Sequence, residues 1–362
     1  MGGTDRRMRN TETDIEMLQA LHGDAFILHC RRGENKGIVV VDGGPNQNSR
    51  YVVERLDELG SIDLMILTHY DDDHIGGILA YIRKHKEARP FPVKEMWLNC
   101  AYEIPVYSSS NVSFRQAKRL ADELTEINLS LEKEGFPKVK WQDPITNDRA
   151  KISFPFGDFL ILSPAPDIKK MNDENYLEDI ANSNIGRKYT VQEKALATPL
   201  SKLVLNKKKP PKNTKQAVIN WSSIAFVVEC DNFKALMLGD SYPCTIIEKL
   251  IDWGFSKDKP LKLDYVKVSH HGSRFNISNE MLDMIDSNAF LISTNGGKGV
   301  SCHPDRETIA NILCHTNRKQ ENTIRLYFNY SLERIASRGY QFLNEEEQIE
   351  YNFEVFDNVQ QI

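Results

Sequence analysis

The segment at residues 68–77 places several potential metal ligands close together. These are His69, Asp71, Asp73 and His74. The apolar run at residues 64–67 comes directly before them and predicts a buried strand, so the ligands would lie at the carboxyl end of a strand, where open α/β sheets place their chemistry. An acidic turn that caps a helix would explain Asp72 alone. It does not explain the whole set, because carboxylates packed this closely repel one another unless a cation neutralises them. The segment therefore predicts a metal site.

The composition is that of a globular protein, with 40% hydrophobic and 27% charged residues in a chain of 362. A net charge of −5 gives no overall basic footprint, so any nucleic-acid contact has to be local. The six cysteines are scattered without a CxxC pair, which favours free thiols in a reducing compartment. Residues 1–16 lack an apolar core, and no run approaches the ~20 apolar residues of a membrane span. We therefore expect a cytoplasmic protein without a membrane segment.

Apolar runs of strand length alternate along the chain with segments of helical period, which indicates an α/β fold. Helices are predicted at residues 49–59, 75–85 and 113–134. Strands are predicted at residues 26–28, 37–41, 64–67, 94–98, 139–141, 159–162, 223–230, 235–238, 263–268, 290–293, 324–328 and 349–355.

Two further turns carry potential ligands directly after apolar strands. Asp240 follows residues 235–238, and His270 and His271 follow residues 266–268. A carboxylate after a strand is often only a helix N-cap. Three such ligand sets at strand ends in one chain are much harder to explain as helix caps, so together they favour a metal site.

These stretches resemble the metallo-β-lactamase superfamily and, within it, the hydrolase domain of ComEC-like competence proteins. The usual first motif HxHxDH appears here with an Asp in place of the second His, a substitution that the ComEC-like branch shares. The other matching stretches are Gly23-Asp24-Ala25, Val41-Asp42-Gly43-Gly44, Asn220-Trp221-Ser222-Ser223, Leu238-Gly239-Asp240, Ser269-His270-His271-Gly272-Ser273 and His303-Pro304. They run in order over roughly residues 17–315. The resemblance implies an αββα four-layer sandwich of the metallo-β-lactamase type.

The resemblance also sets the domain organisation that we expect. Residues 1–330 would form the hydrolase domain, with residues 167–219 as an insertion or flap. Residues 331–362 would be a short C-terminal extension packed on this domain.

The resemblance further implies two divalent metal ions, for which Zn²⁺ and Mn²⁺ both remain open because carboxylate-rich ligation softens a preference for Zn²⁺. The ligands of the first ion would be His69 and Asp71. Those of the second would be Asp73, His74 and His270, with Asp240 bridging. No His matches the usual third motif, whose place the segment 220–223 takes, so the first ion would have few ligands. Either His270 or His271 could be the ligand; we favour His270, with His271 facing the substrate.

Such a centre suits hydrolysis of a phosphodiester by a metal-activated water. Asp73 would accept the proton of that water, and His303 would donate a proton to the leaving oxygen or bind a phosphate oxygen. The alternative for His303 is a surface residue beside a helix start. Donors to the other phosphate oxygens would come from Ser222, Ser223, Ser273 and Asn295.

We therefore expect a nuclease that acts on DNA or RNA, with a protein partner and a role in antiviral defence among the functions that the resemblance allows. The lysine-rich segment 207–215 would track a nucleic-acid backbone or simply form a solvated loop. A second hypothesis is a hydrolase of a small molecule, such as a cyclic nucleotide or another phosphoester, with a lactam the weakest candidate. A third is a non-catalytic subunit, which the clustered carboxylates disfavour, since a scaffold has no use for unneutralised charge.

Overall fold

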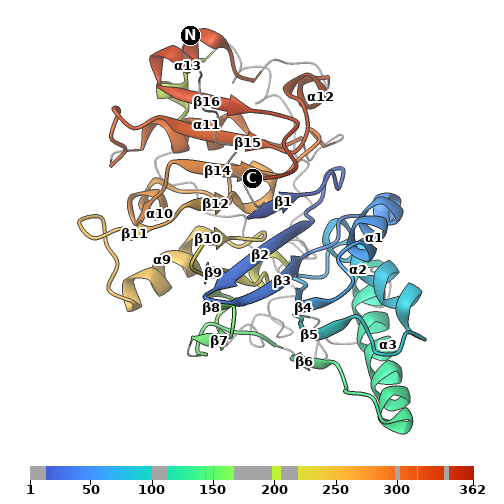
Figure 1. Cartoon of the computed structure of the whole chain (residues 1–362). Coiled ribbons are helices and arrows are strands. Elements are labelled where there is room, and N and C mark those ends of the chain that lie inside the picture. The colour runs from blue at the N-terminus through green and yellow to red at the C-terminus, as the bar shows by residue number, and fades with distance from the viewer. Residues whose placement is uncertain are drawn as a thin grey trace, which may run out of the picture.

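The chain is described by a computed structural model that covers residues 14–99, 112–142, 144–149, 151–166, 198–204, 219–297, 302–315, 317–337 and 342–362. Two large sheets dominate it (Figure 1). The first has six strands, in the order β1 (Ile15–Met17), β2 (Phe26–Arg32), β3 (Asn35–Val41), β4 (Ile62–Ile66), β5 (Val93–Trp97) and β6 (Lys140–Gln142). The second has eight, in the order β16 (Phe353–Phe356), β15 (Ile324–Phe328), β14 (Ala289–Ile292), β12 (Tyr265–Lys267), β10 (Lys234–Met237), β9 (Ala225–Glu229), β8 (Gly157–Ser163) and β7 (Ile152–Phe154). A small third sheet pairs β11 (Leu261–Lys262) with β13 (Ile285–Asp286).

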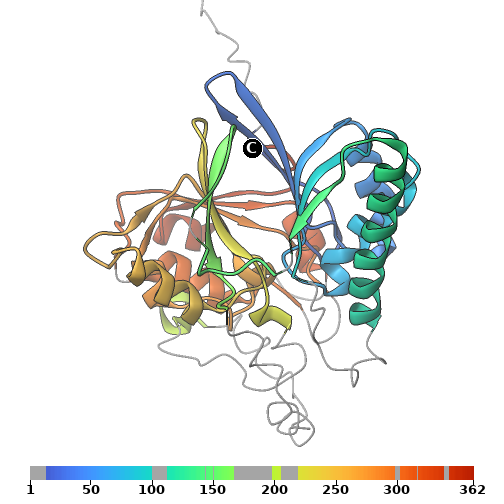
Figure 2. The same ribbon diagram turned by 90° about the horizontal axis from the view of Figure 1, so that it is seen from below.

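Helices cover the outer face of each sheet, so the layers run helix, sheet, sheet, helix (Figure 2). The first sheet carries α1 (Ser49–Asp57), α2 (Asp72–His85) and α3 (Val112–Glu134). The second is accompanied by α7 (Leu200–Leu203), α9 (Pro243–Asp252), α10 (Asn279–Asp283), α11 (Arg306–Cys314), α12 (Leu332–Ala336) and α13 (Glu345–Glu350). The predicted α/β sandwich is thereby confirmed. Among the described helices, none has the length and apolar character needed to cross a membrane.

Both faces of each sheet are buried, which explains why the strands read as nearly continuous apolar runs. On β2, Phe26 and Leu28 point between the sheets, whereas Ile27 points to the helices of the first sheet. Across the gap, Phe159 and Phe226 of the second sheet fill the space with ring centroids 5.7 Å apart. The two sheets are therefore held face to face by one apolar layer.

Most predicted elements appear within a few residues of their expected positions. The short strands β1 and β7 were not predicted from the sequence. The strand expected at residues 349–355 begins only at Phe353, since residues 345–350 form α13. β16 pairs with β15, and the backbone N–H groups of Asp14 and Ile15 donate to the carbonyl of Ile362, so the last residues lie against β1.

Each sheet changes from antiparallel to parallel pairing along its length. β3 to β6 are parallel in the first sheet, and β10, β12, β14, β15 and β16 are parallel in the second. The carboxyl ends of β4, β10 and β12 lead directly into the turns that hold the predicted ligands. β10 and β12 end at one edge of the second sheet and β4 ends at an edge of the first, so the ligand turns come from both sheets.

A close backbone approach fixes the start of α2 against the loop after β3. A Cβ atom on Gly77 would lie 2.0 Å from the carbonyl oxygen of Gly43, and one on Gly43 would lie 2.4 Å from the nitrogen of Ile78. Only glycine fits at either position. This contact sets the first turn of α2, which carries Asp73 and His74.

Candidate metal centre

The acidic residues at the start of α2 do not cap it. Asp71 occupies the N-cap position, yet its side chain makes no capping hydrogen bond. Asp72 is exposed and accepts from Gln116 Nε2. His69 and His74 are fully buried, and their rings lie 4.1 Å apart between centroids. The simple capping explanation therefore holds for Asp72 at most.

Asp42 lies behind these ligands and orients both histidines. Its Oδ1 accepts from the Thr68 backbone N–H at 2.8 Å, and its Oδ2 accepts from Thr68 Oγ1 and from His74 Nδ1, both at 2.8 Å. Because the Thr68 hydroxyl hydrogen is used on Asp42, Thr68 Oγ1 accepts from His69 Nδ1 at 3.0 Å. Both imidazoles thus carry their proton on Nδ1 and present the Nε2 lone pair, which is the arrangement of a metal ligand whose other nitrogen is held.

His270 and His271 lie in a 3-10 turn, η3 (Ser269–Gly272), directly after β12. Both have left-handed backbones, with φ of 48° and 54°. Residues without a glycine's freedom rarely adopt such conformations, which cost about 1–3 kcal/mol each and cluster at functional sites. The turn brings the two adjacent imidazoles to the same centre, with ring centroids 5.9 Å apart.

Hydrogen bonds hold both of these imidazoles in place. His271 Nδ1 donates to the carbonyl of Ser293 at 3.0 Å, since a carbonyl can only accept, so His271 presents Nε2 as a lone pair. Asn276 Nδ2 donates to the carbonyls of Asp240 and Ser241, which leaves Asn276 Oδ1 facing His270 Nδ1 at 3.1 Å. The same His270 nitrogen lies 3.2 Å from Asn220 Nδ2, so two amide side chains meet the outer side of this ring.

Asp240 joins the ligands into two groups. Its Oδ2 lies 3.8 Å from His69 Nε2 and 3.6 Å from His270 Nε2, and Asp71 Oδ2 lies 3.5 Å from the same nitrogen of His69. We call His69, Asp71 and His270 the Oδ2 group. The other oxygen of Asp240, Oδ1, lies 3.6 Å from His74 Nε2. Asp73 Oδ2 lies 3.9 Å from His74 Nε2 and 3.3 Å from His271 Nε2. We call Asp73, His74 and His271 the Oδ1 group.

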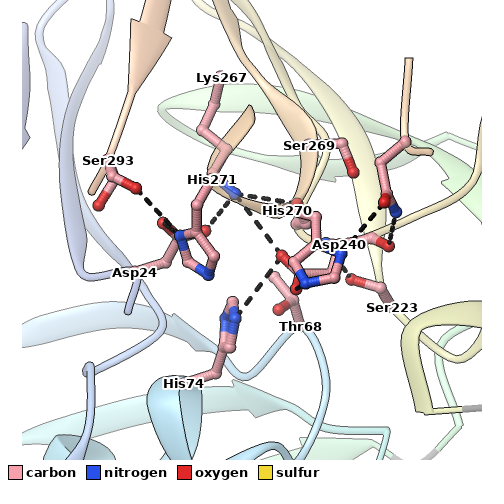
Figure 3. A network of polar contacts seen from close by, with 12 residues as sticks. Asp24, Thr68, His74, Ser223, Asp240, Lys267, Ser269, His270, His271 and Ser293 are labelled. Atoms are coloured by element: carbon pink, nitrogen blue, oxygen red, sulfur yellow. Dashed lines mark hydrogen bonds and ion pairs between the residues drawn. The ribbon is translucent and has the colours of Figure 1, made fainter. Parts of the chain in front are cut away.

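The donor atoms fit divalent cations. The Nε2 atoms of His69, His74 and His271 and the Oδ1 atom of Asp240 are buried and make no hydrogen bond within the described residues. Buried polar atoms normally find a partner, so a set of converging lone pairs without one indicates a cation. Ligand atoms of Asp24, His74, Asp240 and His271 lie within 4.8 Å of one another and point into a common space (Figure 3). Ligands about 2.0–2.2 Å from one ion lie at such mutual distances.

The electrostatics of the protein alone show how strongly this centre favours positive charge. Burial by itself would lower the pKa of His271, yet Asp24, Asp73 and Asp240 raise it to about 10. Burial would likewise lower the pKa of His74, but Asp42, Asp240 and Asp73 raise it well above its ordinary value. Burial lowers the pKa of His270 to about 4, so this imidazole is neutral at pH 7. A metal ion would supply the charge that protons otherwise bring.

The distances between the side chains favour a different division of ligands from the predicted one. His270 was expected beside Asp73 and His74, but it faces the same Asp240 oxygen as His69. His271 was expected to face the substrate, yet it is 3% exposed and its Nε2 points at Asp73. Both histidines thus face the centre, and the Oδ2 group, expected to be poor in ligands, gains His270.

The expected substrate-binding side chains have partners inside the protein. Ser223 is fully buried and its Oγ accepts from the Asp240 backbone N–H at 2.9 Å, so it holds a ligand turn. Ser222 Oγ donates to the carbonyl of Ile219 at 2.6 Å, and Asn295 Oδ1 accepts from Gly297 N at 3.0 Å. Ser273 is 3% exposed, which leaves it little surface for a substrate. Substrate binding by these four residues stays a prediction.

His303 lies at the edge of the centre. Its ring centroid is 5.3 Å from that of His270, and its Nδ1 lies 3.6 Å from Asp305 Oδ2. Its side chain is 15% exposed, compared with 24% for Asp73 and 23% for His270. Contact of His303 with a substrate stays a prediction.

Two residues beside the ligands were not recognised from the sequence. Asp24 is 1% exposed, and its Oδ1 lies 3.3 Å from His271 Nδ1. Lys267 is also 1% exposed and forms an ion pair with Asp24 (Figure 3). A lysine inside the apolar strand 265–268, directly before the histidines, was the available signal. The lysine-rich segment 207–215 lies outside the described residues.

Comparison with known proteins agrees with the fold. Residues 21–162 match the family model of the metallo-beta-lactamase superfamily, and the chain has the α/β sandwich fold of that superfamily. Similar solved structures include the metallo-beta-lactamase fold protein YhfI from Bacillus subtilis, at 9% identity, 96% coverage of both chains and a TM-score of 0.41. Zn²⁺-bound PqqB from Methylobacterium extorquens is 11% identical over 94% of this chain and 87% of its own, with a TM-score of 0.40. A beta-lactamase from Chitinophaga pinensis is 12% identical over 70% and 74%, with a TM-score of 0.33. The comparison with curated proteins gave no match.

Proposed function

We propose that this chain is a metal-dependent phosphodiester hydrolase and, more narrowly, a nuclease of the ComEC-like type that cuts DNA or RNA. The main support for the proposal is that the two carboxylate oxygens of Asp240 face two separate groups of ligands. Each group contains two imidazoles and a carboxylate, which suits Zn²⁺ or Mn²⁺. Bound there, two divalent ions would lower the pKa of a water and stabilise charge on the attacking and leaving oxygens of a phosphodiester.

The protein's own residues supply the proton transfers. Asp73 has the most exposed side chain of the ligand carboxylates, at 24%, compared with 9% for Asp71 and 2% for Asp240. It is thus the carboxylate that an incoming water meets, and it accepts the proton of that water. The His303 ring lies 5.3 Å from that of His270, and His303 donates a proton to the leaving oxygen.

The ComEC-like assignment, a partner protein and a role in bacterial defence rest on the resemblance of the ordered motifs. A plaque assay tests the last of these, with bacteria that express either the wild-type chain or the Asp73→Ala variant. We expect fewer phage plaques only with the wild type. Equal plaque numbers would remove the defence role and leave the hydrolase proposal standing.

The test of the hydrolase itself is a cleavage assay with a matched pair of variants. Circular single-stranded DNA, duplex DNA and RNA are incubated with the purified protein and Mn²⁺ or Zn²⁺. Asp73→Ala should abolish cutting, whereas Asp72→Ala, which removes the exposed neighbour, should not.

A small substrate separates the hydrolase hypotheses. Cleavage of bis(p-nitrophenyl) phosphate without cleavage of any nucleic acid would point to a small phosphodiester and overturn the nuclease proposal. Bound metal without hydrolysis of any of these substrates would overturn the phosphodiesterase proposal as a whole.

A further inference from the structure

Lys267 is a buried cation placed directly against the metal centre. It is the last residue of β12 and lies between the two sheets with 1% of its surface exposed. Its Nζ donates to the carbonyl of Gly239 at 2.9 Å, forms an ion pair with Asp24 and lies 3.9 Å from Asp240 Oδ1 (Figure 3). A buried lysine is costly unless its charge is paired, so this placement needs a reason.

The ammonium lies on a carboxylate that otherwise has the position of a metal ligand. Asp24 converges with His74, Asp240 and His271 to within 4.8 Å. Its other oxygen lies 3.3 Å from His271 Nδ1. Without Lys267, Asp24 would add a third acidic ligand to the Oδ1 group. With Lys267, Asp24 is occupied.

The charges at the centre then balance for two divalent ions. Five carboxylates are gathered there, namely Asp24, Asp42, Asp71, Asp73 and Asp240. Lys267 neutralises one of them, and the four negative charges that remain equal the charge of two divalent cations. Removing the ammonium would leave one carboxylate uncompensated in a region of low dielectric constant, where such an imbalance acts strongly.

We infer that Lys267 is a positioning residue that serves as a built-in cation, holding Asp24 and Asp240 so that the centre takes two divalent ions and not a third. The inference rests on the two-ion centre of the proposed function. It concerns how many ions bind and how tightly, so it is tested without a substrate.

The experiment compares Lys267→Met, Asp24→Asn and the double variant with the wild type. Binding of Mn²⁺ is measured by calorimetric titration, and the number of bound ions by elemental analysis after gel filtration. Lys94→Met is the matched control, because it removes a lysine paired with Asp63 at 2.7 Å on the surface, far from the ligands in the fold.

Opposite effects are expected from the two single variants. Asp24→Asn leaves the ammonium unpaired beside Asp240, so one Mn²⁺ should bind at least about tenfold more weakly. Lys267→Met frees Asp24, so an extra Mn²⁺ should bind or an existing one should bind at least about tenfold more tightly. The double variant restores the balance and should bind two ions within about threefold of wild type, as coupled residues in a mutant cycle do.

The inference is wrong if both single variants bind Mn²⁺ as the wild type does. It is also wrong if both single variants bind Mn²⁺ more weakly and the double variant binds it more weakly still. If Lys267→Met does not fold, the comparison of Asp24→Asn with the double variant still tests the inference. The double variant has no unpaired charge and is therefore expected to fold. A wild type that binds a single ion would instead overturn the two-ion centre. The role of Lys267 would then be supported only if that ion binds more weakly to Asp24→Asn and more tightly to Lys267→Met.

Discussion

Asn276 links His270 to the turn that carries Asp240. The amide nitrogen of Asn276 donates to the carbonyls of Asp240 and Ser241 at 2.9 and 3.2 Å, which leaves its oxygen facing His270 Nδ1 at 3.1 Å. One asparagine thus ties the turn that carries the shared carboxylate to the histidine that faces it. Removing such a hydrogen-bond partner of a metal-binding histidine typically lowers the metal affinity about 10–100-fold.

Replacing Asn276 by Ala should therefore weaken binding at the Oδ2 group. We expect about 10–100-fold lower affinity for one ion and little change for the other. Titration with Mn²⁺ or Zn²⁺ measures both. Asn35→Ala is the control, since Asn35 is exposed at the start of β3. Equal weakening of both ions would show that Asn276 supports the fold of the centre and not one histidine.

Double variants test the division into two groups. His69→Ala/His270→Ala removes both imidazoles of the Oδ2 group and should retain one ion, held by Asp73, His74 and His271. His74→Ala/His270→Ala removes one imidazole from each group and should retain neither ion at micromolar metal, because each ion then has one imidazole fewer.

Elemental analysis after gel filtration gives the ion count for each protein. The opposite result, with one ion kept when His74 and His270 are replaced together, would restore the division predicted from the sequence, in which these two residues bind the same ion. Asp240→Ala should lose both ions in either case, since both groups share it.

The sequence predicted the ligand turns well because each signal was local. An apolar run followed at once by Asp or His predicts a strand end with a ligand, and Asp240 lies where that pattern placed it. The division between His270 and His271 could not be read in this way. Their left-handed backbones break the alternation of side chains that holds in a strand, so neighbours in sequence reach different sides of Asp240.

Long-range pairing explains the residues that the sequence did not reveal. Lys267 lies in an apolar strand, and whether its side chain points to solvent or between the sheets depends on the pairing of β12 with β10 and β14. Its partner Asp24 lies in the other half of the chain. The contact of Ser223 could not be predicted for a different reason: a short hydroxyl in a turn often accepts from a nearby backbone N–H, as Ser223 does from that of Asp240.

Acid should weaken the attachment of β1 through Glu16. Burial alone would raise the pKa of Glu16, but hydrogen bonds from His29 and Arg55 lower it to about 2. The pKa in an unfolded chain is about 4.3, so ionised Glu16 stabilises the fold fully above that pH and loses its effect as the pH falls toward 2. Glu16→Gln should reduce the free energy of unfolding by about 1–3 kcal/mol at pH 7, and its difference from wild type should shrink at pH 3.5.

Urea unfolding at the two pH values measures both quantities. Glu54→Gln is the control, because Glu54 pairs with Arg50 on the surface, where both side chains are largely exposed. Such a pair contributes about 0–1 kcal/mol. A Glu16→Gln deficit that stays the same at both pH values would mean that packing, and not the ionised carboxylate, accounts for the loss.

The loss of kcat on replacing His303 should be larger for a substrate whose leaving group needs a proton. Its ring lies 5.3 Å from that of His270, and Asp305, held by the Arg274 backbone N–H at 2.9 Å, faces its Nδ1. An alkoxide leaving from a nucleic acid requires a proton, whereas p-nitrophenolate leaves without one. His303→Asn should thus lower kcat for DNA by about 10²-fold or more and change kcat for bis(p-nitrophenyl) phosphate by less than about threefold. Equal losses on both substrates, with the ion count unchanged, would assign His303 to phosphate binding, because that contact serves both substrates alike.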